Sequence, residues 1–478
     1  MSTQQFPIET SPVAPGRRRR AIALLRQAIA GEETDYTQGR VGRAVLLLAI
    51  PMMLEMAMES VFAVVDIFFV ARLGAEAVAA VGLTEAMLTL LYAVAVGLSM
   101  AVTALVARRI GEKRADAAAV VAGQTLWVGI AVSVAVGVAG VLYARDLLVA
   151  LGADAAVVES GTAYTAWMLG GCASIVLLFL LNAVFRGAGN AALAMRVLWL
   201  ANGINIVLDP CLIFGWGPFP ELGVAGAAIA TNIGRGVGAL YALYCLIGGN
   251  GVLRLRAAHV RIARGVLAGL LRVSAGGIAQ FAIATSSYIV LMRIVSDYGS
   301  AAIAGYTIAI RIVMFTLLPA WGLSNAAATL VGQNLGAGQP QRAEDSVRSA
   351  ARYNLMFLLA IAAVFIVFAR PLVGIFSTEP DVLANGAACL RIISYGYGFY
   401  AVGMIAVQAF NGAGDTSTPT WVNLIFFWLL QLPLASWLAG GAGLGPRGVF
   451  WAIAISESLM AVAAVLLFRR GRWKRKVV

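Results

Sequence analysis

The amino-acid sequence predicts an all-α integral membrane protein with twelve transmembrane helices in two homologous six-helix bundles. Three observations predict this architecture. Hydrophobic residues make up 61% of the 478 residues and charged residues only 12%, whereas a soluble protein carries about 25% charged residues. Apolar runs long enough to cross a bilayer recur along the chain. The two halves of the chain also repeat each other at one constant spacing.

The apolar runs fall into two sets of six. A membrane-spanning helix needs about 20 predominantly apolar residues, and every run reaches that length. An arginine-rich polar stretch separates the two sets. The runs lie at 44–70, 78–107, 117–142, 158–182, 192–214 and 223–248, and then at 267–295, 301–331, 346–369, 384–409, 418–439 and 447–468.

The two sets are copies of one unit. SMAVTALVARRIG at 99–111 resembles SNAAATLVGQNLG at 324–336, and AVFRGAGN at 183–190 resembles QAFNGAGD at 408–415. Both pairs are 225 residues apart. Because six is an even number, both copies enter the membrane in the same orientation. We therefore expect a pseudo-two-fold axis along the membrane normal, with a cleft between the bundles.

The repeat and the charge distribution together predict five segments. Lys and Arg gather at both ends of the chain, in the central linker and in alternate loops, and such an excess marks the cytoplasmic side. This orientation accounts for the net charge of +12 without a nucleic-acid partner. We expect a multi-pass protein of the cell (inner) membrane with both termini in the cytoplasm. The segments are a cytoplasmic tail (1–43), an N-lobe (44–248), a cytoplasmic linker (249–265), a C-lobe (266–468) and a basic cytoplasmic tail (469–478).

Carboxylates inside the first predicted span form one stripe. At 100° per residue, Glu59 lies about 40° from Glu55 around the helix, and Asp66 lies about 20° from Glu55. A charged residue at the centre of a span costs about 2.5–3.5 kcal/mol by insertion scales, so the stripe must face protein or water. Polar side chains also share one face of the fifth span and occur in the sixth: Asn202, Asn205, Asp209 and Thr231.

The second copy of the repeat lacks these acids. Asp66 corresponds to Leu291, and Asp209 corresponds to Leu434. Because the second copy folds without them, we interpret the acids as functional. A buried carboxylate can take up a proton near neutral pH, and two carboxylates with neutral oxygens could instead hold Na⁺. The predicted ion-coupling residues are Asp66, Asp209, Asn205, Thr231 and Glu59; Asp66, Asp209 and Asn205 are metal ligands only in the Na⁺ case. No cofactor beyond the coupling ion is predicted.

A second group of side chains is the candidate substrate cavity. Methionine and aromatic residues can form an adaptable surface for varied apolar ligands, although the same residues also serve helix packing. Glu457 is a further acid in the last span, and the sequence leaves its role open. The candidate cavity residues are Glu55, Asn202, Gln280, Tyr288, Met292, Met314 and Tyr395.

These motifs resemble those of the multidrug and toxic compound extrusion (MATE) family, over about residues 44–468. The resemblance rests on Pro51 and Asp66 with VDIFFVARLG, on FRGAGN and FNGAGD, on GVAGAAIAT (223–231) and on SNAAATLVGQNLGAG (324–338). It implies a two-lobed antiporter that exports organic, often cationic, compounds in exchange for H⁺ or Na⁺. It also implies that Asp66, Asn205, Asp209 and Thr231 are the ion-site residues. The lack of acids at the second-half positions resembles the DinF-like branch rather than the NorM-like branch.

Other functions fit the sequence less well. A flippase for lipid-linked sugars, from the same superfamily, would need many cationic residues along its cleft, and Arg235, Arg293 and Arg311 are few. An enzyme would need a metal cluster, a nucleotide loop or a nucleophile motif, and the sequence shows none of these. The expected partners are a small organic substrate and membrane lipids. We expect a monomer because the two-fold relationship is already internal.

Overall fold

The computed structural model describes residues 17–32, 34–249 and 252–476, and every regular element in these ranges is helical. The predicted tails and linker extend beyond them, because residues 1–16, 250–251 and 477–478 lie outside the described part of the chain.

The first half of the chain builds one bundle. Local signals set its helix ends: the Asp154 side chain accepts a hydrogen bond from the Val157 amide, and the Asn190 side chain accepts one from Leu193, as N-cap residues do. Gly215 ends a helix with a positive φ of 70°. The elements are α1 (Arg17–Ala30), α2 (Val41–Val70), η1 (Ala71–Leu73), α3 (Ala75–Gly111), α4 (Ala115–Ala150), α5 (Ala155–Gly170), α6 (Cys172–Ala188), α7 (Ala191–Phe214) and α8 (Val224–Gly248).

The second half repeats this order after a short 3₁₀ turn. Its fifth segment contains π-helical turns, where each amide bonds to the carbonyl five residues back, and Pro433 lies between them. The elements are η2 (Ala257–Val260), α9 (Arg264–Ser296), α10 (Ser300–Gly336), α11 (Pro340–Gly374), α12 (Pro380–Tyr395), α13 (Tyr397–Gly412), α14 (Ser417–Asn423), η3 (Leu424–Gln431), α15 (Leu432–Ser436), η4 (Trp437–Gly441), α16 (Pro446–Arg469) and η5 (Arg472–Arg475).

The described helices account for the twelve predicted spans. Ten segments are long and apolar enough to cross a membrane, and α12 with α13 forms an eleventh that bends by 60°. The twelfth is α8, whose 25 residues rise about 37 Å and so exceed the hydrocarbon thickness of about 30 Å. It contains Asn232 and Arg235 and is therefore more polar than the others.

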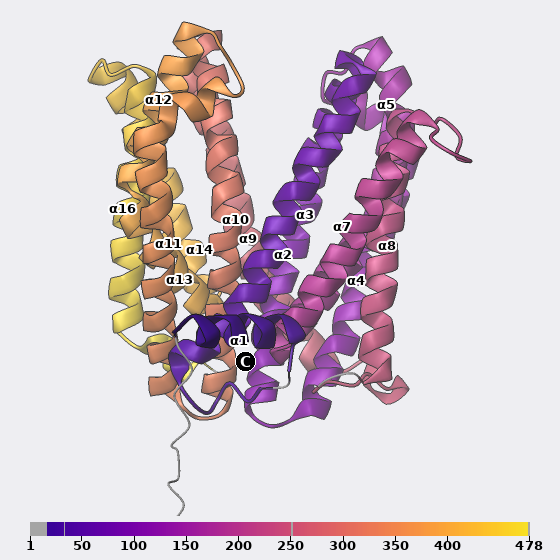
Figure 1. The fold of residues 1–478 in the computed structure, drawn as a ribbon, viewed down its shortest axis with the longest axis vertical. Helices are drawn as coiled ribbons and strands as arrows, with labels where there is room; N and C mark the ends of the chain where they lie inside the picture. Colours follow the sequence, from indigo (N-terminus) through magenta and orange to yellow (C-terminus); the bar gives the residue numbers. More distant parts are fainter. Residues whose placement is uncertain (1–16, 33, 250–251, 477–478) are drawn as a thin grey trace, which may run out of the picture.

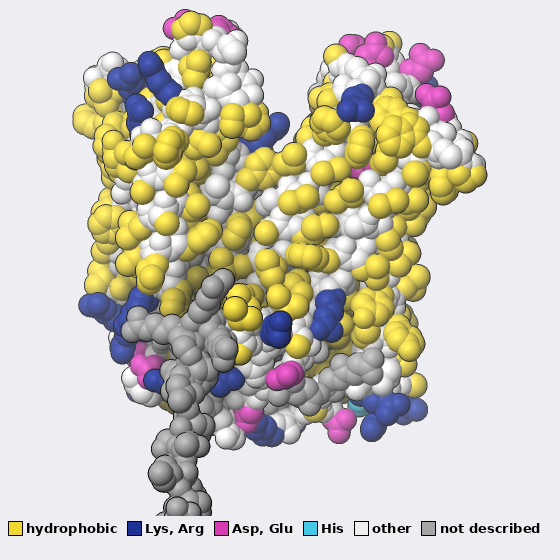
Figure 2. All heavy atoms as spheres, in the orientation of Figure 1, with side chains coloured by type: hydrophobic (Ala, Val, Ile, Leu, Met, Phe, Trp, Pro, Cys, Tyr) yellow, Lys and Arg dark blue, Asp and Glu magenta, His cyan; other side chains and the backbone are white. Residues whose placement is uncertain are grey.

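The two halves form the arms of a V (Figure 1). The arms meet at the end where α1 and the C-terminal residues lie, and a hollow separates them at the other end (Figure 2). A broad apolar band covers the sides of both arms between two ends that carry charged side chains. This surface suits a chain that crosses a bilayer.

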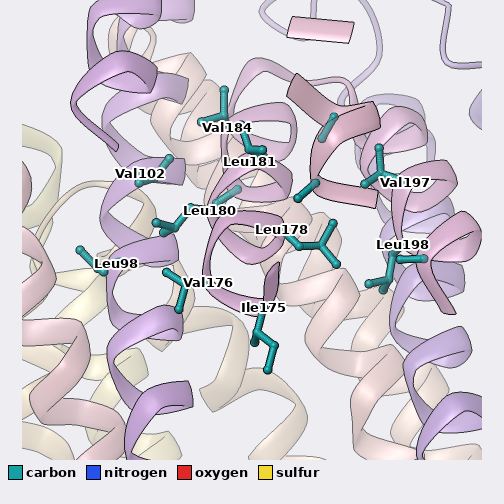
Figure 3. Close-up of a cluster of buried hydrophobic side chains, with 14 of the residues drawn as sticks. Leu98, Val102, Ile175, Val176, Leu178, Leu180, Leu181, Val184, Val197 and Leu198 are labelled. Atoms are coloured by element: carbon teal, nitrogen blue, oxygen red, sulfur yellow. The ribbon is translucent and has the colours of Figure 1, made fainter. Parts of the chain in front are cut away.

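Each arm has its own apolar core, and a third core joins them. Figure 3 shows part of the N-lobe core, where Leu98 and Val102 lie beside the α6 residues from Ile175 to Val184. Leu291 and Val295 belong to the C-lobe core. In the third core, Val45, Leu48 and Met52 of α2 cluster with buried residues of α10, α11 and α13. The first half of α2 therefore packs on the C-lobe.

Glycines allow the closest helix crossings between the lobes. A Cβ on Gly97 of α3 would lie 2.4 Å from the Ile278 amide of α9, and a Cβ on Gly322 of α10 would lie 2.5 Å from the Met52 carbonyl of α2. Gly322 follows Gly97 by 225 residues. The crossings α3–α9 and α10–α2 are therefore equivalent, which confirms the pseudo-two-fold arrangement of the bundles.

Candidate functional site

A buried polar triad joins α7 to α8 in the N-lobe. The Asn205 side-chain amide donates to the Asp209 carboxylate at 3.3 Å and to the Thr231 hydroxyl at 3.0 Å. The exposed fractions of Asp209, Asn205 and Thr231 are 0%, 1% and 5%. The helices approach closely because Gly234 of α8 faces α7, where a Cβ would lie 2.5 Å from the Ala201 carbonyl.

The triad leaves two acceptor atoms without a partner. Among the described residues, no donor reaches the second carboxylate oxygen of Asp209 or the side-chain oxygen of Asn205, and both atoms are buried. A buried acceptor without a donor is costly unless something else satisfies it. A proton on Asp209 or a small cation between the two oxygens would do so.

A second polar cluster lies on the neighbouring helices. One Glu59 oxygen of α2 accepts from the Arg235 guanidinium of α8 at 3.0 Å, and the other accepts from the Asn202 amide of α7 at 3.0 Å. The guanidinium also lies over the Phe62 ring, 5.2 Å from its centroid. Arg235 is only 2% exposed, so it needs a compensating carboxylate. Glu59 supplies that charge.

Asp66 connects the two clusters electrostatically. It is partly buried on α2, and its charge interacts with those of Arg235 and Asp209. Its side chain makes no hydrogen bond or ion pair in the described part of the chain. With all groups ionised, Glu59, Asp66 and Asp209 oppose the single cation Arg235. Two negative charges remain in excess, and they lie in the region where Asp209 lacks a donor.

Glu55 lies one turn before Glu59 on α2 and has a different environment. Its carboxylate accepts from the Arg186 guanidinium at 2.7 Å and from the Asn182 amide at 3.2 Å, both on α6. Glu55 is 1% exposed. The FRGAGN motif therefore provides the counter-ion of Glu55, and its Arg186 and Gly187 carbonyls accept from Thr329 and Gln333 of α10.

The candidate cavity residues of the C-lobe do not form one cluster. Gln280 is buried and bonds to the Asn411 side chain and the Thr416 carbonyl. The Tyr288 ring stacks on Tyr306, which stacks in turn on Phe450 in the C-lobe core. The remaining members vary: Met292 is half-buried, Met314 is exposed, and the exposed Tyr395 stacks on Trp451 of α16.

Sequence reasoning did not assign three charged residues that the structure places at or near these clusters. Arg235 lies one turn after Thr231 on α8, and that spacing could have placed it on the same face. Arg186 is part of a motif that we recognised without giving this residue a role. Glu85 of α3 interacts electrostatically with Asp66 and with Arg311 of α10, so it links the N-lobe cluster to the C-lobe.

The donors present suit a proton or a hard monovalent ion better than a transition metal. Within the described ranges, no group of three or more His, Cys, Asp or Glu is placed to hold a metal ion. Asp209, Asn205 and Thr231 offer oxygen atoms only, which hard cations prefer.

Two lobes related by an internal two-fold, with ionisable residues buried in the spans, define a membrane transporter. A family model described as MatE matches the chain twice, at residues 51–211 and 278–437, once in each half. The chain belongs to the MATE family of transporters, and it is not an enzyme.

Curated relatives align along most of the chain. An FAD transporter of Shewanella oneidensis is 29% identical over 90% of this chain and 95% of its own length. A probable multidrug resistance protein NorM of Thermotoga maritima is 27% identical over 92% of this chain and 94% of its own. The multidrug export protein MepA of Staphylococcus aureus is 24% identical over 90% of this chain and 94% of its own.

Solved structures share the fold. A multidrug resistance MATE family transporter in an outward-facing conformation superposes with a TM-score of 0.87, at 26% identity, over 93% of this chain and all of the other. A transporter of the same superfamily from Pyrococcus furiosus, described as having a binding pocket of reverse polarity, gives the same three values. The DinF-like branch stays a prediction.

Proposed function

We propose that this chain is a cation-coupled antiporter that exports organic, often cationic, amphiphilic compounds by alternating access. One observation carries the proposal: Asp66 and Asp209 form an uncompensated pair of carboxylates in the N-lobe, and the equivalent positions of the C-lobe hold Leu291 and Leu434. A charged pair that only one copy of the scaffold contains is not needed for folding. It is suited to bind and release H⁺ or Na⁺.

The V-shaped conformation supports a rocking mechanism. The lobes meet at the end that carries both termini and diverge at the other. With both termini in the cytoplasm of a cell (inner) membrane, the cleft opens outward. Drug and ion would favour different states, and each would then drive release of the other through the conformational equilibrium. A single chain already contains both lobes, so a monomer suffices.

The relatives guide the choice of substrate. Two of those named above are described as multidrug proteins and one as an FAD transporter, so a fluorescent organic cation and FAD are the two compounds to compare. The MatE match in both halves does not favour the flippase alternative. The coupling ion is H⁺ or Na⁺, and the assay below separates them.

The test is transport in proteoliposomes under separately imposed pH and Na⁺ gradients. We expect one gradient to drive substrate accumulation and its collapse to abolish it. Asp209→Asn keeps the shape and the hydrogen bond from Asn205 but cannot ionise, so it should lose gradient-driven transport while folding normally. Asp297→Asn is the matched control, because Asp297 is 62% exposed and pairs only with Arg293.

Near-normal, gradient-dependent transport by Asp209→Asn would reject the ion-site proposal. In that case Asp209 only ties α7 to α8, and its loss would lower the unfolding temperature instead. Accumulation of neither compound by the wild-type protein, under either gradient, would reject the proposed export of such substrates.

A further inference from the structure

A pocket of about 300 Å³ opens between α3, α4 and the start of α9, at the closed end of the V. Its walls are largely apolar, and two glycines on one face of α9 leave it open, because a Cβ on Gly265 or Gly269 would meet no atom within 4 Å. The lining residues are Leu105, Arg109, Arg114, Ala117, Val120, Val121, Gly265, Val266 and Gly269. The pocket is distinct from the carboxylate clusters described above.

The loop between α3 and α4 gives the pocket a positive rim. Three guanidinium groups, those of Arg108, Arg109 and Arg114, share the single carboxylate of Glu112. This group therefore carries a net charge of +2. The Arg114 side chain is 64% exposed, and so is available to a ligand. An apolar pocket with a cationic rim matches a molecule that has an anionic head and an apolar body.

The internal repeat shows how such a groove can be closed by the protein itself. Ala117 corresponds to Arg342, 225 residues further on. Arg342 donates to the Gly39 carbonyl at 2.8 Å and to the carbonyls of Tyr36 and Gln38, which precede α2 as residues 261–264 precede α9. The Arg342 side chain therefore closes the C-lobe groove. Alanine at the same place leaves the N-lobe groove unfilled.

We propose that this pocket binds one anionic phospholipid from the leaflet on the closed side. The phosphate lies against Arg114 and its neighbours, and an acyl chain runs along Val120, Val121 and Val266. Basic pockets between transmembrane helices bind lipid head groups in this way. Because α9 crosses from one lobe to the other beside this pocket, the lipid sits at the joint about which the lobes must move.

The experiment is native mass spectrometry of the detergent-purified protein, titrated with palmitoyl-oleoyl phosphatidylglycerol or with the zwitterionic phosphatidylcholine of the same chains. We expect one phosphatidylglycerol to bind in preference to phosphatidylcholine. Arg114→Gln should weaken it about fivefold, the loss expected for one cation near an anionic surface. Ala117→Arg, which copies the C-lobe, and Gly269→Leu, which fills the space without a clash, should abolish the preferred binding.

Arg348→Gln is the matched control. It removes one arginine from the equivalent side of the C-lobe, with a side chain 63% exposed, and should leave the binding unchanged. Equal affinity for both lipids, or unchanged binding by the folded Ala117→Arg and Gly269→Leu proteins, would overturn the proposal. Displacement of the lipid by excess glycerol 3-phosphate would also overturn it, since the site would then recognise a free phosphate ester.

Discussion

The Glu55 carboxylate accepts a hydrogen bond from Arg186 at 2.7 Å, and the same two places in the second half of the chain hold Gln280 and Asn411. Those two amides also bond to each other, at 3.0 and 3.2 Å. An ion pair in one lobe thus corresponds to a neutral pair in the other. Both pairs join the first span of a lobe to its fourth, so this contact belongs to the shared scaffold.

We predict that the ion pair can be replaced by its neutral counterpart. Arg186→Asn alone leaves a buried, uncompensated Glu55 and should cost about 3–5 kcal/mol of stability. The double variant Glu55→Gln/Arg186→Asn copies the C-lobe pair and should recover most of that loss. Thermal unfolding in detergent measures both. A double variant as unstable as Arg186→Asn would show that the charges themselves are required.

Asp66 and Asp209 are expected to act as one unit. Asp66→Asn should abolish ion-driven transport as Asp209→Asn does, and the double variant should be no worse than either single variant. Introducing Leu434→Asp into Asp209→Asn should not restore activity, because the C-lobe position lacks the partners of the triad. Proteoliposome transport is the measurement. Independent, multiplying losses would contradict a single shared ion site.

The Glu59–Arg235 pair offers a test of which acids couple the ion. Glu59→Ala leaves Arg235 buried without a carboxylate and should destabilise the protein by about 3–5 kcal/mol. The double variant Glu59→Ala/Arg235→Met copies the C-lobe residues Ala284 and Met460 and should regain stability. We expect it to keep ion-coupled transport, since Asp66 and Asp209 remain. A stable but uncoupled double variant would place Glu59 in the ion site.

The inter-lobe crossings should not tolerate one added methyl group. Gly97→Ala or Gly322→Ala puts a Cβ within 2.5 Å of backbone atoms on the facing helix, and such overpacking typically costs 1–3 kcal/mol. Gly82→Ala is the control on α3, because its Cβ would meet no atom within 4 Å. Thermal unfolding compares the three. Equal stability of Gly97→Ala and Gly82→Ala would mean that the lobes do not pack this closely.

The spans and the repeat could be predicted because both are properties of local sequence. Twenty apolar residues must form a helix in a bilayer, and a constant offset survives in the text of the chain. The least apolar span, α8, was still found because the repeat required a sixth helix in the first half.

The partners of the acids could not be predicted in the same way. Arg186 lies 131 residues from Glu55, and Arg235 lies 176 residues from Glu59, so their meeting depends on which helix faces turn toward each other. The aromatic residues posed a related difficulty. Tyr288 in a stacked core and Tyr395 beside Trp451 have the same sequence pattern, and only packing tells them apart.

The crossing of helices between the lobes was also not visible in the sequence. The predicted boundaries place all of residues 44–70 in the N-lobe, yet Val45, Leu48 and Met52 pack on the C-lobe. Hydropathy marks where a helix spans the membrane but not which neighbour it leans against.

This exchange of first helices has a consequence for the origin of the molecule. A six-helix half would expose the apolar face of its first helix at the place where the other half now covers it. The ancestor that was duplicated must therefore have worked as a parallel pair of identical chains, each helping to complete the other. Fusion into one gene then freed the two copies to diverge, and only one of them carries the pair of aspartates today.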